Sequence, residues 1–242
     1  MRFYTTGSKP LACSEATVMR QSCERFGINL ELEVLADFSW AGWASRKAFV
    51  RYIRALPGAE VVLTTDAWDA FFCAGPGEIE GKYRESGFPI VMAAETVLYP
   101  PEFWGREQYP PSPTRWRYAN GGVVIGTVEA LLSLFTADDF WPAGMGTNQE
   151  AFHDWVLRHP GHIGLDRQAK LFQTLYGVPG GVVAVRDGRI VNRETGSFPC
   201  IVHGNGGNGW RAAELWRQMN APKEDRAARL RAERRKLLAR RR

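Results

Sequence analysis

The stretch Val61-Val62-Leu63-Thr64-Thr65-Asp66-Ala67-Trp68-Asp69 decides the fold and places the first candidate for chemistry. Its first five residues are β-branched or apolar, a pattern typical of a buried strand. Two carboxylates, Asp66 and Asp69, follow directly and can turn toward one point. Because carboxylate oxygens are ligands for hard divalent cations, the stretch predicts a strand that ends in a metal site. The alternative is an ordinary turn, in which aspartates bond to the nearby backbone.

A second segment, His203-Gly204-Asn205-Gly206, follows the apolar run that begins at Cys200. One imidazole added to two carboxylates favours Mn²⁺, with Mg²⁺ as the alternative, over Ca²⁺. The glycines let backbone N–H groups approach an anion closely. A cation at Asp66, Asp69 and His203 that keeps open positions can hold a diphosphate. The alternative for this segment is a plain glycine-rich turn.

Predicted strands and helices alternate along the first part of the chain. The strands are expected at 3–6, 30–35, 61–65, 89–95, 121–126, 182–185, 189–192 and 200–203. The helices are expected at 14–26, 45–56, 78–86, 128–135 and 147–158, the last with Thr147 and Glu150 as a capping box. This order predicts an α/β fold with a mostly parallel, doubly wound sheet. Ligands of such sheets bind beyond the carboxyl ends of the strands, where Asp66 and Asp69 fall.

Composition and length predict one globular domain over residues 1–221. The chain has 242 residues, of which 45% are hydrophobic and 12% aromatic, enough for a sizeable core. Its four cysteines contain no CxxC pair, which argues against a zinc knuckle or a disulfide framework. The sequence shows no charged leader and no apolar run of about 18 residues. A cytoplasmic protein without a membrane span, in a bacterial or viral-type setting, is the expectation.

The charge is concentrated in the last residues, 222–242, which hold ten Lys and Arg against three Asp and Glu. The rest of the chain then has 21 basic and 23 acidic residues, a net charge of −2 within a total of +5. The tail is rich in helix formers and contains no glycine. It predicts a basic helix that binds nucleic acid or an anionic membrane surface, or else a plain solvated helix.

Residues 99–117 interrupt the alternating pattern with five prolines, two tryptophans and three arginines. Such a segment is typical of a functional loop, because aromatic and arginine side chains stack on sugars or bases. The alternative is a loop whose aromatic side chains cover the core. His153, His159 and His162 lie around a helix end and a turn, where exposed or capping roles are more common than metal ligation.

Several ordered motifs together resemble one family, the glycosyltransferase domain of the procollagen lysyl hydroxylases. The resemblance spans roughly residues 1–210. The matching motifs are Asp66-x-x-Asp69, Ala94-Glu95 followed by Tyr99-Pro100, Asn120-Gly121-Gly122 through Gly126, Leu165-Asp166, Phe172-Gln173, and His203-Gly204-Asn205-Gly206.

The resemblance implies a GT-A fold and transfer of a hexose from a UDP-sugar, such as UDP-glucose or UDP-galactose, with manganese. It implies that Asp66, Asp69 and His203 hold the metal. The donor would contact residues on several segments, namely Thr6, Lys47, Trp68, Asn205 and Gly206. Glu95, Asn120, Asn148 and Gln149 are the candidates for positioning the donor sugar and the acceptor hydroxyl.

Two positions depart from the family pattern. Gly146-Thr147-Asn148 stands where the family has an acidic run before its glutamine, and Gly209 stands where the family has a lysine. The acceptor, or the way it is held, is therefore expected to differ. Three functions stay open: hexose transfer to a hydroxyl of a protein, glycan or small molecule, the same transfer to hydroxymethylated bases of DNA, and a nucleotide-sugar-binding module without catalysis.

Overall fold

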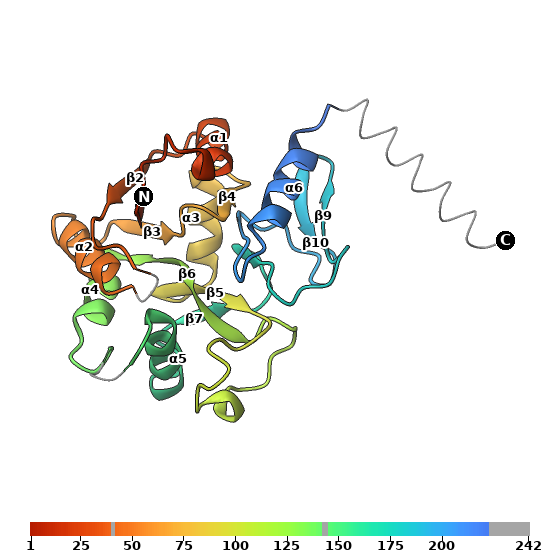
Figure 1. The fold of residues 1–242 in the computed structure, drawn as a ribbon. Helices are drawn as coiled ribbons and strands as arrows, with labels where there is room; N and C mark the ends of the chain where they lie inside the picture. Colours follow the sequence, from red (N-terminus) through yellow and green to blue (C-terminus); the bar gives the residue numbers. More distant parts are fainter. Residues whose placement is uncertain (40–41, 142–144, 223–242) are drawn as a thin grey trace.

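A six-stranded sheet forms the centre of the computed structural model, which describes residues 1–39, 42–141 and 145–222 (Figure 1). Its strands, in spatial order, are β2 (Leu30–Val34), β1 (Arg2–Gly7), β3 (Val61–Thr65), β6 (Tyr118–Thr127), β5 (Ile90–Glu95) and β7 (Gly164–Asp166). All neighbours pair in parallel except β6, which is antiparallel to both β3 and β5. The predicted α/β fold with a mostly parallel sheet is confirmed.

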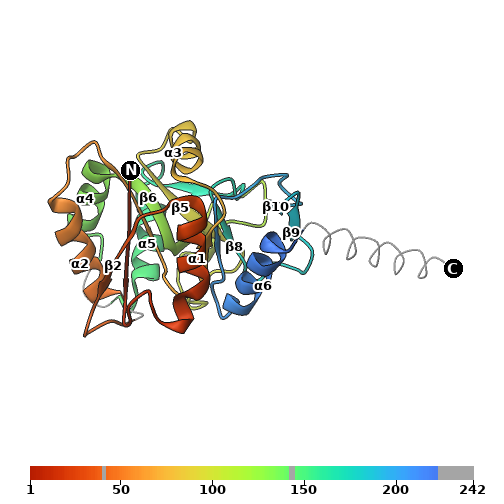
Figure 2. The same cartoon turned by 90° about the horizontal axis from the view of Figure 1, so that it is seen from above.

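Helices cover both faces of this sheet (Figure 2). One face packs on α1 (Thr17–Phe26) and α3 (Pro76–Glu85), and the other on α2 (Trp43–Arg54), α4 (Val128–Thr136) and α5 (Asn148–Arg158). The side chains of β3 are apolar on both faces of the sheet, so both faces must be covered by helices. Val61 and Leu63 join one apolar cluster and Val62 joins the other, because successive side chains of a strand point to opposite faces.

A second, three-stranded sheet lies beside the first, in the order β4 (Ala70–Phe72), β11 (Ile201–His203) and β8 (Phe172–Thr174). Helix α6 (Gly209–Asn220) and the hairpin of β9 (Val183–Arg186) and β10 (Arg189–Asn192) pack on it through an apolar cluster of their own. Two short 3₁₀ helices, η1 (Ser14–Ala16) and η2 (Arg106–Gln108), complete the elements.

Local sequence signals account for several element ends. Gly27, with φ of 65°, closes α1 in the left-handed conformation that glycine adopts readily. The Thr127 hydroxyl caps α4 by accepting from the Ala130 N–H. The capping box of α5 is confirmed, because the Glu150 N–H donates to the Thr147 hydroxyl and the Thr147 N–H donates to the Glu150 carboxylate.

Among the strands and α-helices of the described residues, the sequence patterns do not predict β4, β7, β8 and α6, and they also miss the short helix η2. The three strands have three residues each, too few to show a period in the sequence. In the described residues, no helix has the length and apolarity needed to cross a bilayer. The predicted basic helix from residue 223 onward lies outside the described part of the chain.

Candidate functional site

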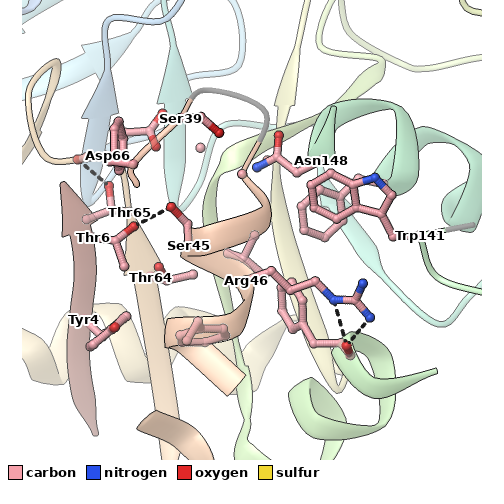
Figure 3. A pocket seen from close by; sticks show the side chains of 18 of the residues that line it. Tyr4, Thr6, Ser39, Ser45, Arg46, Thr64, Thr65, Asp66, Trp141 and Asn148 are labelled. Atoms are coloured by element: carbon pink, nitrogen blue, oxygen red, sulfur yellow. Dashed lines mark hydrogen bonds between the residues drawn. The ribbon is translucent and has the colours of Figure 1, made fainter. Parts of the chain in front are cut away.

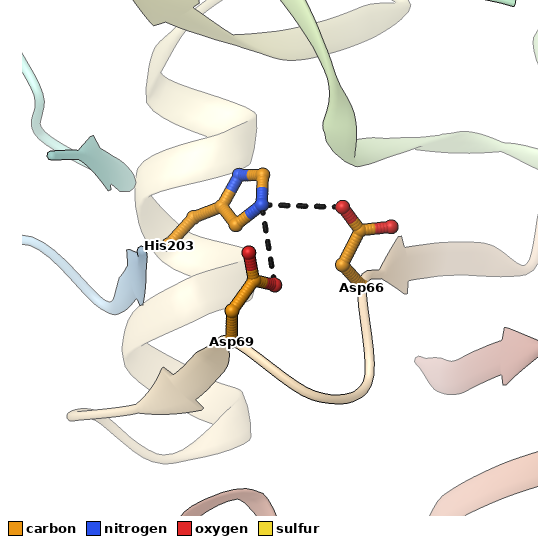
Figure 4. A group of neighbouring side chains, drawn as sticks. All are labelled: Asp66, Asp69 and His203. Atoms are coloured by element: carbon orange, nitrogen blue, oxygen red, sulfur yellow. Dashed lines mark ion pairs between the residues drawn. The ribbon is translucent and has the colours of Figure 1, made fainter. Parts of the chain in front are cut away.

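Three elements bring Asp66, Asp69 and His203 together (Figure 4). Asp66 directly follows β3, Asp69 directly precedes β4, and His203 ends β11, where it is in register with Ala70. His203 Nε2 lies 3.1 Å from Asp66 Oδ2 and 3.5 Å from Asp69 Oδ1. One potential ligand atom from each side chain lies within 4.8 Å of the others. The three side chains therefore fit the predicted set of ligands for one divalent cation.

Backbone hydrogen bonds fix the turn that carries the two carboxylates. The Asp66 N–H donates to the Gly122 carbonyl at 2.8 Å, and the Gly204 N–H donates to the Asp69 carbonyl at 2.7 Å. The first bond ties the turn to β6, and the second ties it to the loop after β11. The separation between Asp66 and Asp69 is thus set by both sheets.

The charges of these three groups are strongly linked. Burial alone would lower the pKa of His203, but the nearby carboxylates of Asp69 and Asp66 outweigh it and raise the pKa to about 10. Burial raises the pKa of Asp69, whereas His203 outweighs that effect and brings the pKa below its usual value. A bound cation would replace the imidazolium proton as the positive charge between the carboxylates.

Asn120 fixes the orientation of the His203 ring through the ring nitrogen that does not face the carboxylates. The Asn120 Oδ1 atom accepts from the Gly122 N–H at 3.2 Å and faces His203 Nδ1 at 3.0 Å. Because the Asn120 atom that contacts the Gly122 N–H accepts a hydrogen bond, it is the amide oxygen. The same oxygen faces His203 Nδ1, so His203 Nδ1 carries a proton and donates to it. His203 Nε2 then faces the carboxylates, as a metal-bound histidine with a fixed tautomer does.

Gly122 leaves the space that the side chains of His203 and Asp66 occupy. A Cβ atom at this position would clash with the imidazole ring of His203 and would lie 2.7 Å from Asp66 Oδ2. The second glycine of the Asn-Gly-Gly motif is therefore required by close approach, since its backbone does not have a positive φ.

Glu95 lies beneath this site at the end of β5 and is 2% exposed. Its two carboxylate oxygens accept from Gln149 Nε2 and from Asn205 Nδ2, each at 2.7 Å. Burial raises the pKa of Glu95 to about 8, although the amides of Asn120 and Asn205 and the charge of His203 act to lower it. The carboxyl group thus links residues that lie on β6, on α5 and on the loop after β11.

Backbone groups fix the orientation of both amides. Gln149 Oε1 accepts from the Gly121 N–H, and its Nε2 also donates to the Ala119 carbonyl. Asn205 Oδ1 accepts from the N–H groups of Leu175 and Tyr176, each at 3.0 Å. Both NH₂ groups must therefore point at Glu95.

A pocket opens from Asp66 between β1, α2 and α5 (Figure 3). Its polar wall includes Thr6, whose hydroxyl donates to Ser45 Oγ at 2.8 Å, and Asn148, whose side chain packs against the backbone of Gly42. Its apolar floor consists of aromatic rings, namely Phe49, Phe135, Phe140, Trp141 and Phe152. The Arg46 guanidinium in the floor donates to the Phe135 carbonyl.

The other residues predicted to contact the sugar donor, Trp68, Lys47, Asn205 and Gly206, do not line this pocket. Trp68 is half-buried in the turn between the carboxylates, and its indole covers Gly7 at the end of β1. Gly206, with φ of 63°, lies under the ring of Tyr176. Lys47 is exposed on α2 and does not line the pocket. Thr6, Asp66 and Asn148 share the pocket lining.

Sequence reasoning does not single out Ser45 or Tyr176, and it misjudges His153. Ser45 sits in the first turn of α2, and nothing in its local pattern distinguishes it from a surface serine. His153 is fully buried rather than exposed: its ring lies 2.5 Å from the Tyr109 hydroxyl and 2.9 Å from the Tyr99 carbonyl. The available signal is its position on the apolar side of α5, next to Phe152.

Asp166, part of the Leu165-Asp166 motif, has a structural role. Its carboxylate accepts from the backbone N–H groups of Lys170, Leu171 and Phe172. It holds the loop between β7 and β8.

Known proteins resemble this chain in sequence and in fold. The family model described as "PLOD GT domain" matches residues 54–215. The human multifunctional procollagen lysine hydroxylase and glycosyltransferase LH3 is 28% identical over 155 residues, which is 60% of this chain and 20% of the human protein. The rat procollagen-lysine,2-oxoglutarate 5-dioxygenase 1 is 27% identical over 205 residues, which is 77% of this chain and 28% of the rat protein.

The chain thus spans less than a third of the length of these curated relatives. Among solved structures, the galactosyltransferase LgtC in complex with donor and acceptor sugar analogs superposes with a TM-score of 0.53 at 12% identity, covering 94% of this chain and 99% of LgtC. This likeness confirms the GT-A fold. With the family model covering most of the described residues, the chain belongs to the family of the PLOD GT domain, the glycosyltransferase domain of the procollagen lysyl hydroxylases.

Proposed function

We propose that this protein is a metal-dependent glycosyltransferase that moves a hexose from a UDP-sugar to an acceptor hydroxyl. The observation that supports the proposal most directly is the convergence of Asp66, Asp69 and His203, of which Asp66 also lines a pocket. The donor set of two carboxylates and one imidazole suits Mn²⁺, and Mg²⁺ is the alternative.

In the transfer, the bond between sugar C1 and the β-phosphate oxygen breaks, and UDP leaves with the bonding electrons. A new bond forms between C1 and the acceptor oxygen, whose proton is released. A divalent cation held by the three ligands would supply positive charge where the departing diphosphate becomes more negative.

The residues of the chain have distinct parts in this scheme. Thr6 and Trp68 border the end of β1, where we place the nucleoside of the donor. Asn148 lines the pocket and carries an amide suited to sugar hydroxyls, since amides both donate and accept. Gln149 and Asn205 have their amides engaged with Glu95 and the backbone, so we assign them a positioning role. Glu95 holds the amides of Gln149 and Asn205 in place, and Asn120 holds His203.

The experiment is a donor screen that measures UDP release from UDP-glucose and UDP-galactose with Mn²⁺, with Mg²⁺ and with a chelator. Release that requires the metal and is lost in Asp66→Asn and His203→Ala supports the proposal. Calorimetric Mn²⁺ binding to the same variants provides a second readout. Metal-independent release, or Mn²⁺ binding that survives both substitutions, contradicts it.

A binding module without catalysis makes a different prediction for the same screen. It binds UDP-sugars in the presence of Mn²⁺ but releases no UDP with any acceptor. Asn148, which stands in place of a family carboxylate, is the feature that motivates this comparison.

A further inference from the structure

Three exposed aromatic side chains follow the carboxyl ends of β5, β8 and β11. Tyr99 and Tyr176 lie on the loops after β5 and β8, and Trp210 lies in the first turn of α6. Tyr99 is 57% exposed, Tyr176 is 37% exposed and Trp210 is 71% exposed. We call these three residues the aromatic rim. An exposed tryptophan or tyrosine leaves a large apolar face in water, and several of them beside one site mark a surface that a ligand covers.

Tyr176 and Trp210 are each joined directly to the segment that follows His203. The Tyr176 ring lies against Gly206, where a Cβ atom would clash with it, and the Tyr176 N–H donates to Asn205 Oδ1. Trp210 follows Gly209, where an added Cβ atom would lie 3.4 Å from the Cβ of Asp69. Tyr176 therefore lies against the loop that follows His203, and Trp210 directly follows a glycine that lies near Asp69.

The loops that carry Tyr99 and Tyr176 are fastened to each other. The Thr174 hydroxyl donates to the Ala94 carbonyl, and the Thr96 hydroxyl donates to the Tyr176 carbonyl at 2.7 Å. A Cβ atom at Gly177 would lie 2.6 Å from a methyl group of Val97. These contacts fix the backbone that carries the two rings, so less backbone freedom is lost when a ligand stacks there, which favours binding.

Two arginines on the loop that carries Tyr99, Arg115 and Arg117, are already engaged, so within the described residues these two side chains offer the rim no free cation. Arg115 forms an ion pair with Glu194, with Nε and Oε2 2.7 Å apart. Arg117 donates to the backbone carbonyls of Tyr109 and Pro110. Gly209 stands where the family pattern has a lysine. Phosphate-rich acceptors such as DNA need free cations, whereas a sugar ring needs a flat apolar surface for its C–H face.

We propose that the acceptor of this enzyme is a neutral carbohydrate, whose terminal ring stacks on Trp210 and Tyr176 while its hydroxyl faces the donor. This inference rests on the proposed function, because it names the acceptor class of that same site. It assigns to Trp210 the role of an acceptor-binding residue.

The test uses the full chain, UDP-glucose and UDP-galactose as donors, Mn²⁺, and a panel of neutral methyl glycosides and disaccharides, with products detected by mass spectrometry. Duplex DNA containing hydroxymethylcytosine is included as the competing acceptor. We expect transfer to a neutral glycoside. Trp210→Ala should raise the acceptor KM by roughly tenfold, about 1.4 kcal/mol, with a smaller change in kcat. Trp210→Phe should recover most of the loss, because it keeps an aromatic face.

The matched control is Phe88→Ala, which removes an aromatic side chain that is 41% exposed. Phe88 lies two residues before the first residue of β5, at the end of the strand opposite Glu95. It should leave the acceptor KM unchanged. Transfer to DNA, transfer to none of the neutral acceptors, or an acceptor KM unaffected by Trp210→Ala would each overturn the inference. Donor turnover in the wild-type protein separates the two claims, since metal-dependent UDP release persists if only the acceptor class is wrong.

Discussion

At the scale of single residues, Gly122 shows how little space there is beside the proposed metal ligands. We expect Gly122→Ala to remove Mn²⁺ binding, because a methyl group there meets both His203 and Asp66. Calorimetric titration with Mn²⁺ checks this, and Gly81→Ala, on a helix position with nothing within 4 Å of a Cβ, is the control. Undiminished affinity in Gly122→Ala would show that the ligands do not use the observed arrangement.

Glu95 gives a second prediction at this scale, and it concerns stability. Since Gln149 and Asn205 both point NH₂ groups at it, Glu95→Gln places a third NH₂ group against one of them. We expect the substitution to lower the free energy of unfolding by about 1–3 kcal/mol, the cost of an unsatisfied buried donor. Urea denaturation at pH 9, above the pKa of about 8 of the Glu95 carboxyl, measures it, with Glu24→Gln on the exposed side of α1 as the control. Equal stability of the two variants would show that the amides can turn away.

At the scale of elements, α5 carries both a cap and a buried histidine. Thr147→Ala removes the hydroxyl that accepts from the Glu150 N–H, and we expect a loss of about 1 kcal/mol of stability. Thr147→Ser keeps the cap and should be nearly neutral. Because Asn148 and Gln149 form the first turn, the alanine variant should also raise the KM for the donor. A stable variant with an unchanged KM would contradict this role for the cap.

His153 makes the stability of α5 depend on pH. Burial lowers its pKa to about 4, and the Tyr99 carbonyl opposes this only in part. The Tyr99 carbonyl requires a proton on Nε2, so Nδ1 accepts from the Tyr109 hydroxyl and the ring is neutral. The unfolded chain binds a proton near pH 6.5 and the folded one near pH 4, so this contribution to stability is complete above pH 6.5 and is lost as the pH falls toward 4.

The lost contribution amounts to up to about 3 kcal/mol between these two pH values. The free energy of unfolding should therefore fall less steeply between pH 7 and pH 4 in His153→Gln than in the wild type. Parallel slopes in the two proteins would mean that His153 is accessible to protons in the folded state.

The elements also show which structure could be predicted from the sequence. Asp66 and Asp69 are predictable because one local run contains both the strand and its polar end, and Thr147 with Glu150 because a capping box has a fixed spacing. Helix α6 escapes prediction because the glycines before it suggest a turn, although its buried residues repeat at helical spacing. The pocket wall formed by Ser45 depends on contacts between distant segments, which a single sequence does not reveal.

At the scale of the whole molecule, a cation at the site would connect the two sheets. Asp66 belongs to the end of β3 in the large sheet, whereas Asp69 and His203 adjoin β4 and β11 in the small one. Mn²⁺ should therefore raise the Tm of the wild-type protein, since a ligand that binds only the folded state stabilises it by mass action. Thermal unfolding with and without a chelator tests this, and Asp69→Asn should remove most of the Mn²⁺-dependent shift.

The turn from Asp66 to Asp69 restricts the insertions and deletions that evolution can accept in this chain. Its two ends are anchored to Gly122 and Gly204, so an insertion or deletion of even one residue there would misalign both anchors. The hairpin that holds β9 and β10 carries none of the three ligands. Natural variants should therefore differ in length around that hairpin while the spacing of the two aspartates stays constant.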